Sequence, residues 1–115
     1  MTVKDLAERL SLKNWTPEVG LEATVTGGYA GDMLSWVMAR AGSGSVWMTI
    51  MSNQNVAAVA LMADVACVVL TEDVEPDEAL LTQARARELP LFSSPLSTYA
   101  LSCRLGALLA DEQGL

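Results

Sequence analysis

Four consecutive hydrogen-bonding side chains, Ser52-Asn53-Gln54-Asn55, stand between two apolar stretches of the chain. Hydroxyl and amide groups both donate and accept hydrogen bonds, so this segment could recognise a neutral polar ligand. The same residues also suit a structural turn, in which Asn55 and Ser52 bond the backbone as a helix cap and an Asx-turn. The sequence leaves both interpretations open.

A second segment with chemical potential is the glycine-rich stretch Gly27–Gly31, which Asp32 follows. Helix N-termini and bare backbone amides can bind anions, so this glycine stretch could bind a phosphate. The stretch matches neither the G-x-G-x-x-G fingerprint nor a Walker P-loop. The alternative is a tight strand-to-helix turn that glycine permits, with Asp32 opening the helix.

Five carboxylates gather shortly after, at Glu72, Asp73, Glu75, Asp77 and Glu78. Hard cations take several oxygen ligands, but the spacing does not match an EF-hand loop. Acids are also favoured in the first turn of a helix, which accounts for Asp77 and Glu78. We therefore predict no metal ion and no cofactor.

Histidine is absent, which excludes Ser-His-Asp and Cys-His catalysis and imidazole metal sites. An enzyme would need an activated Ser, Cys or carboxylate pair, so we predict no catalytic residue. Fourteen acidic against seven basic residues give a net charge of −7, which disfavours nucleic-acid binding. No Lys or Arg occurs between Arg40 and Arg85, so a polyphosphate would have to bind backbone amides and hydroxyls.

Alternating elements must position these segments. Helices are predicted at Val3–Leu12, Asp32–Ala41, Val56–Ala63 and Asp77–Arg87. A last helix, capped by Ser94, is predicted to run to Ala110. Strands are predicted at Leu21–Thr26, Val46–Met51, Val65–Leu70 and Leu89–Phe92. Continuous apolar strands between helices indicate an α/β fold, a three-layer α/β/α domain with a small, mostly parallel sheet of about four strands. The 115 residues suffice for a single domain, 1–115.

Ligands of such sheets bind beyond the carboxyl ends of the strands, where the turns meet. The residues predicted to contact a ligand there are Gly28, Asp32, Ser52, Asn53, Asn55 and Thr71.

The cysteines predict the compartment. Cys67 lies in an apolar strand and Cys103 in a helix, without a CxxC pair, so both are expected as free thiols in the cytoplasm. Asp5, Glu8 and Arg9 do not suit a signal peptide. Residues 41–63 carry no charge, but the polar tetrapeptide at their centre would be costly inside a bilayer, so no membrane span is predicted.

The helix Val56–Ala63 is apolar on every face, and the helix Asp32–Ala41 is nearly so. Such helices are normally buried all round, and a small three-layer domain has few elements to surround them. We expect a homodimer through these two helices, with Ala57, Ala58 and Ala60 allowing close approach. The alternative is that Val56, Val59 and Ala60 pack on the sheet while the other alanines face water.

Residues Gly27–Leu105 resemble the DRTGG domain, a small α/β/α module related to the N-terminal domain of HPr kinase/phosphorylase. The resemblance lies in the stretches GDMLSWVMARA, VWMTIMSNQNVAAVALMADVACVVLTEDVEPDEALL and LPLFSSPLSTYAL, with Thr98 matching. Where many members have Gly-Asp-Arg, this chain has Ser52-Asn53-Gln54, and where they have Thr-Gly-Gly it has Thr71-Glu72-Asp73. An anion site built on that arginine and those glycines is not expected here.

The resemblance implies a module without a catalytic site. Stand-alone members of this kind look like accessory proteins encoded beside iron-only hydrogenase subunits. We therefore expect an accessory or regulatory module that self-associates, with a hydrogenase-related protein as a candidate partner. The alternative is a sensor that binds a nucleotide-like molecule at the carboxyl edge of the sheet.

Overall fold

Four parallel strands and one short antiparallel strand form the sheet of the computed structural model, which describes residues 1–114. The strands are β1 (Lys13–Asn14), β2 (Gly27–Ala30), β3 (Ser45–Thr49), β4 (Cys67–Leu70) and β5 (Leu91–Ser93). Their order is β1-β5-β4-β3-β2, with β1 antiparallel to β5. The three-layer α/β/α prediction is confirmed, with one strand more than expected.

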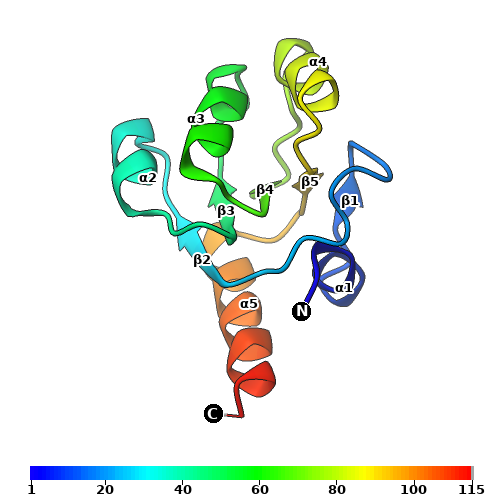
Figure 1. Ribbon diagram of the computed structural model, residues 1–115, viewed down its shortest axis with the longest axis vertical. Helices are drawn as coiled ribbons and strands as arrows, with labels where there is room; N and C mark the ends of the chain where they lie inside the picture. The colour runs from blue at the N-terminus through cyan, green and yellow to red at the C-terminus, as the bar shows by residue number, and fades with distance from the viewer. Residues whose placement is uncertain (115) are drawn as a thin grey trace.

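The helices cover both faces of the sheet. They are α1 (Val3–Arg9), α2 (Leu34–Arg40), α3 (Asn55–Ala63), α4 (Glu78–Ala86) and α5 (Thr98–Glu112). Helices α2, α3 and α4 lie together on one face, and α1 and α5 lie on the other (Figure 1). Among the described helices, none is both long and apolar enough to cross a bilayer.

Burial on both faces explains the continuous apolar runs of the central strands. Trp47 and Val68 point toward α2, α3 and α4, whereas Met48 and Val69 point toward α1 and α5. All residues of β3, β4 and β5 are buried. Strands enclosed on both faces need no polar alternation, so periodicity alone would not have identified them.

Helix α3 lies between α2 and α4 and is enclosed on its inner half. Val56, Val59, Ala60 and also Ala57 are buried within the single chain. Ala57 is 1% exposed and is therefore not available to a partner. The outer half of α3, represented by Met62 at 68% exposure, stays open to solvent.

The predicted turn at Gly27–Gly31 is wrong, because Gly27–Ala30 is strand β2. The predicted strand Leu21–Thr26 is also wrong, and it makes only an isolated bridge between Thr24 and Thr2. Its carbonyl groups instead accept hydrogen bonds from the N-terminal amides of α1, with Val3 N bonding Ala23 O at 2.9 Å. Val25 is buried but Ala23 is exposed, so the alternating pattern does not mark a sheet face, and the segment instead supplies acceptors to the first-turn amides of α1.

Two predicted helix caps are also wrong. Met33 is the residue before α2, and no side chain caps this helix. The Asp32 carboxylate instead accepts a hydrogen bond from Thr49 at the end of β3. Ser97 caps α5 by accepting a hydrogen bond from Ala100 N, whereas Ser94 accepts from Leu96 N in the preceding turn. Pro95 lies in this turn, three residues before the helix begins.

Candidate functional site

The carboxyl edge of the sheet is a set of hydrogen bonds between the loops that leave the strands. Asp32, which follows β2, accepts bonds from Thr49 Oγ1 at 2.7 Å and from Ile50 N at 2.9 Å. Thr49 is fully buried at the end of β3, and its hydroxyl also accepts from Met51 N. The Asp32 carboxylate therefore connects the β2 loop to the β3 loop.

The loops after β4 and β5 are joined in the same way. Thr71 Oγ1 and Thr98 Oγ1 lie 2.6 Å apart, and Thr71 is fully buried. The Glu72 carboxylate accepts a hydrogen bond from Thr98 N at 2.9 Å, beside the start of α5. Thr71 is therefore engaged with the protein, and its exposed surface for a ligand is negligible.

Ser52 belongs to a third connection. Its hydroxyl donates to Asp77 Oδ1 at 3.0 Å, and its carbonyl accepts from Asp77 N. Asp77 is the residue before α4, so this pair attaches the β3 loop to the start of α4. The predicted cluster of acids thus includes a structural acceptor at Asp77.

Asn53 and Asn55 behave differently from the rest of the predicted site. Asn53 Oδ1 accepts from Asn55 N at 2.9 Å, so the turn is an Asx-turn made by Asn53, whereas the structural alternative assigns it to Asn55 and Ser52. Asn55 lines a groove of about 240 Å³ between α3 and α4, together with Gln83 and Arg87. This groove is separate from the Thr71–Thr98 pair, so the six predicted residues do not form one pocket.

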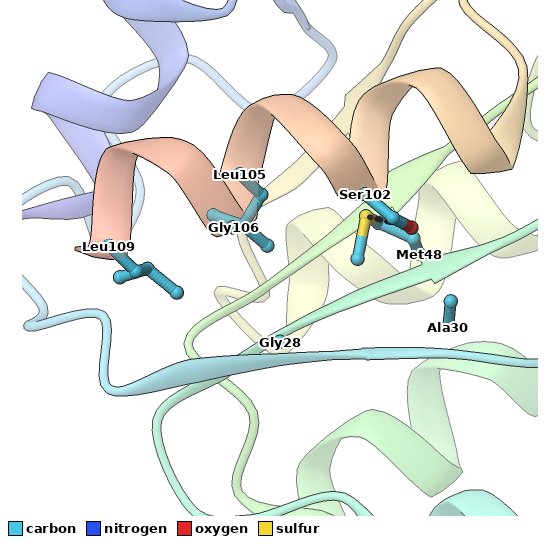
Figure 2. A pocket seen from close by; sticks show the side chains of 7 residues that line it. All are labelled: Gly28, Ala30, Met48, Ser102, Leu105, Gly106 and Leu109. Atoms are coloured by element: carbon cyan, nitrogen blue, oxygen red, sulfur yellow. Dashed lines mark hydrogen bonds between the residues drawn. The ribbon is translucent and has the colours of Figure 1, made fainter. Parts of the chain in front are cut away.

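Gly28 lies in the middle of β2 rather than at the carboxyl edge. It lines a groove of about 300 Å³ between β2 and α5, together with Ala30, Met48, Ser102, Leu105, Gly106 and Leu109 (Figure 2). A Cβ at position 28 would lie 2.7 Å from Leu105 Cδ2, so glycine allows α5 to pack closely. Sequence analysis missed the α5 residues of this groove, and Gly106 faces open space, because a Cβ there would meet no atom within 4 Å.

Glu72 and Asp73 both have a left-handed backbone, with φ of 59° and 63°. These are the positions where the resemblance places two glycines. Left-handed backbone favours glycine, because a Cβ crowds the backbone there. The turn therefore keeps its backbone shape while carrying carboxylates, which makes this edge acidic.

The remaining titratable groups do not converge on a centre. Among residues 1–114, no three Cys, Asp or Glu side chains are placed to hold a metal ion. Cys67 and Cys103 are both unbonded. Burial raises the pKa of Cys67 to about 12, because the charged thiolate would be desolvated, so this thiol is a weak nucleophile.

Comparisons with known proteins address the fold and the family. No curated protein matches the chain. A solved structure of the CBS and DRTGG domains of the regulatory region of Clostridium perfringens pyrophosphatase, complexed with its activator diadenosine tetraphosphate, is similar with a TM-score of 0.71. The two sequences are 13% identical, and the alignment covers 90% of this chain and 45% of that one, so the present chain corresponds to about half of that structure.

The sequence comparison is more specific. Residues 22–108 match the DRTGG domain, which is most of the chain. The matched region includes β2 to β5 and all the loops of the carboxyl edge. The chain therefore belongs to the DRTGG domain family.

Proposed function

We propose that this protein is a non-catalytic, cytoplasmic regulatory or accessory module that self-associates. The observation that carries the proposal is the carboxyl edge, where the reactive side chains are hydrogen-bonded to one another. Asp32, Thr71 and Ser52 each have a protein partner at 2.6 to 3.0 Å. Thr49 and Thr71 are fully buried, so their hydroxyls do not meet a substrate, and the hydrogen bonds of this edge support loop geometry instead.

The solved relative supports the regulatory part of the proposal, since its DRTGG domain belongs to the regulatory region of a pyrophosphatase. The unbonded Cys67 and Cys103 support a reducing compartment. The resemblance to stand-alone members encoded beside iron-only hydrogenase subunits makes such a hydrogenase a candidate partner. Co-purification of the tagged chain with a hydrogenase subunit from its own cells tests this part.

Exposed apolar side chains support self-association. Met33, Trp36 and Met38 lie on or beside α2, and Leu61 and Met62 lie on α3, with exposures from 39% to 68%. Large exposed apolar residues that lie near one another often mark a protein interface. The surface proposed here differs from the one expected from sequence, because the inner half of α3 is buried within the chain.

A second function, sensing of a nucleotide-like ligand, is favoured by one observation. The solved relative is complexed with its activator, diadenosine tetraphosphate. The carboxyl edge of the present chain opposes an equivalent role, since Asp32, Glu72, Asp73 and Asp77 line its loops and would repel phosphates.

Thermal unfolding with and without nucleotides separates the two functions. A ligand at a hundredfold excess over its Kd stabilises the folded state by about 2.7 kcal/mol, which is readily detected. The regulatory-module proposal predicts no shift of Tm with ATP or diadenosine tetraphosphate. A shift that Asn53→Ala abolishes, while Gln83→Ala leaves it intact, would establish the sensor at the predicted edge.

A further inference from the structure

We propose that β2 is the edge through which two copies of this chain associate, pairing antiparallel into one continuous sheet. The proposal rests on the proposed self-association and specifies its geometry. A twofold axis perpendicular to the sheet, passing beside Tyr29, would place α2 next to the partner's α2 and α5 next to the partner's α5.

The outer edge of β2 is open. Within residues 1–114, β2 is the last strand of the sheet and pairs only with β3. Gly31 N donates to Met48 O at 3.1 Å, which directs the backbone groups of residues 31 and 29 toward β3. Backbone groups alternate in direction along a strand, so those of Gly28 and Ala30 point outward. Both residues are exposed.

This edge also lacks the usual protection against pairing. Exposed edge strands normally carry a charge, a proline or a bulge that blocks a second strand. Residues 27–31 are Gly, Gly, Tyr, Ala and Gly, with no charge and no proline. In a chain of net charge −7, an uncharged edge is where two copies meet with the least repulsion.

The register fits a second copy. A twofold axis perpendicular to the sheet requires paired residues to share a face, and Gly28 and Ala30 line the same groove beside α5. Pairing Gly28 with the partner's Ala30, and Ala30 with the partner's Gly28, satisfies this requirement and makes four backbone hydrogen bonds. Tyr29 then faces the partner's Tyr29 as a non-hydrogen-bonded pair, the type in which side chains approach most closely.

Grooves on both sides of the edge favour an entire second chain over an isolated peptide strand. On the α5 side lies the groove of about 300 Å³ that contains Gly28 and Ala30 (Figure 2). On the α2 side lies a groove of about 350 Å³, lined by Tyr29, Met33 and Trp36. A stable interface buries about 1,200–2,000 Å², more than a four-residue strand supplies. A second copy also brings its α2 and α5 against these grooves.

Sedimentation of three variants tests the pairing. Ala30→Pro removes an outward amide without removing a bond to β3, and proline is tolerated at such edge positions. Ala30→Lys keeps the amide and adds a charge to the edge. Ala86→Lys is the matched control, because Ala86 is exposed on α4, away from β2.

The wild-type chain is expected at twice its 12.2 kDa mass at micromolar concentration. Both Ala30 variants should be folded and raise the dimer Kd by about thirtyfold or more, while Ala86→Lys should stay dimeric. If Ala30→Pro does not fold, Ala30→Lys decides. Wild-type dimers that persist in the folded Ala30 variants overturn the edge pairing but not self-association. A monomeric wild-type chain overturns both.

Discussion

The carboxyl edge and the outer edge of β2 are opposites in composition and in hydrogen bonding. The carboxyl edge is rich in hydroxyls and carboxylates, and these are paired with one another, as in Asp32–Thr49 and Thr71–Thr98. The outer edge of β2 has no polar side chain apart from Tyr29, yet its outward backbone groups have no partner strand in the described part of the chain. Polar residue type is therefore a poor guide to where this molecule can bind.

The difference has a physical origin. A loop that leaves a buried strand must satisfy its backbone groups, and Ser, Thr, Asn and Asp are the residues that do so locally. An edge strand has no such requirement, because water satisfies its outward groups until a partner replaces the water. The polar side chains of the loops thus have a structural role within the monomer, whereas the unpaired backbone groups of the β2 edge do not.

The largest expected contrast is in thiol reactivity between the sheet interior and the helix that flanks β2. Cys67 is buried in β4, with its pKa raised to about 12, and Cys103 is exposed on α5. Labelling with a disulfide reagent at pH 8 should modify Cys103 at least about a thousandfold faster than Cys67. Equal labelling rates for the two thiols in the folded protein would contradict the burial of the sheet. The variant Cys103→Ser retains only Cys67 and so identifies the slow thiol.

Removal of the Asp32 carboxylate should have the largest effect on stability at the carboxyl edge. Asp32→Ala leaves the Thr49 hydroxyl and Ile50 N without their acceptor, and should lower the free energy of unfolding by about 2 kcal/mol. Asp32→Asn keeps an oxygen acceptor and should lose less than half of this amount. Urea denaturation measures the free energy of unfolding of both variants. An unchanged free energy of unfolding in Asp32→Ala would show that the hydrogen bonds to Asp32 do not stabilise the fold.

Disruption of the hydroxyl pair Thr71–Thr98 should have a smaller effect on the free energy of unfolding. Thr71→Val deprives Thr98 Oγ1 of its partner and should lower the free energy of unfolding by about 1 kcal/mol. The double variant with Thr98→Val should recover part of the loss, because neither hydroxyl is then left unpaired. Additive losses in the double-mutant cycle would mean that the two hydroxyls do not interact.

The smallest effect concerns the two left-handed residues. Asp73→Gly relieves backbone crowding at φ of 63° and should raise the free energy of unfolding by about 0.5 kcal/mol. Glu72→Gly gives the same relief but removes the carboxylate bonded to Thr98 N, and should lower stability by about 0.5 kcal/mol. Stability changes of the same sign in the two variants would refute the role assigned to Glu72.

The fold was largely predictable from the sequence, because buried parallel strands leave continuous apolar runs that a surface element cannot have. The runs at Val46–Met51 and Val65–Leu70 are indeed β3 and β4. The edge strands were not predictable in this way. Gly27–Ala30 has the composition of a turn, and Lys13–Asn14 is too short to show a period.

For the predicted site, the sequence indicated which loops carry its residues but not how these residues are hydrogen-bonded. Sequence order placed Asp32, Ser52 and Thr71 after strands, and they do lie at the carboxyl edge. Their hydrogen-bond partners Thr49, Asp77 and Thr98 depend on how the loops meet in space, which residue spacing does not encode. The glycine-rich composition of residues 27–31 predicts a turn and therefore puts Gly28 at this edge, whereas the structure has strand β2 there.

Hydrogen exchange along β2 tests the account most directly. Tyr29 N points toward β3, whereas Gly28 N and Ala30 N point outward. If β2 pairs with its copy, the Tyr29 amide should exchange slowly at every protein concentration, and exchange of the Gly28 and Ala30 amides should slow as the concentration rises into the dimeric range. Fast exchange of Gly28 and Ala30 in a protein that sediments as a dimer would contradict the pairing of β2.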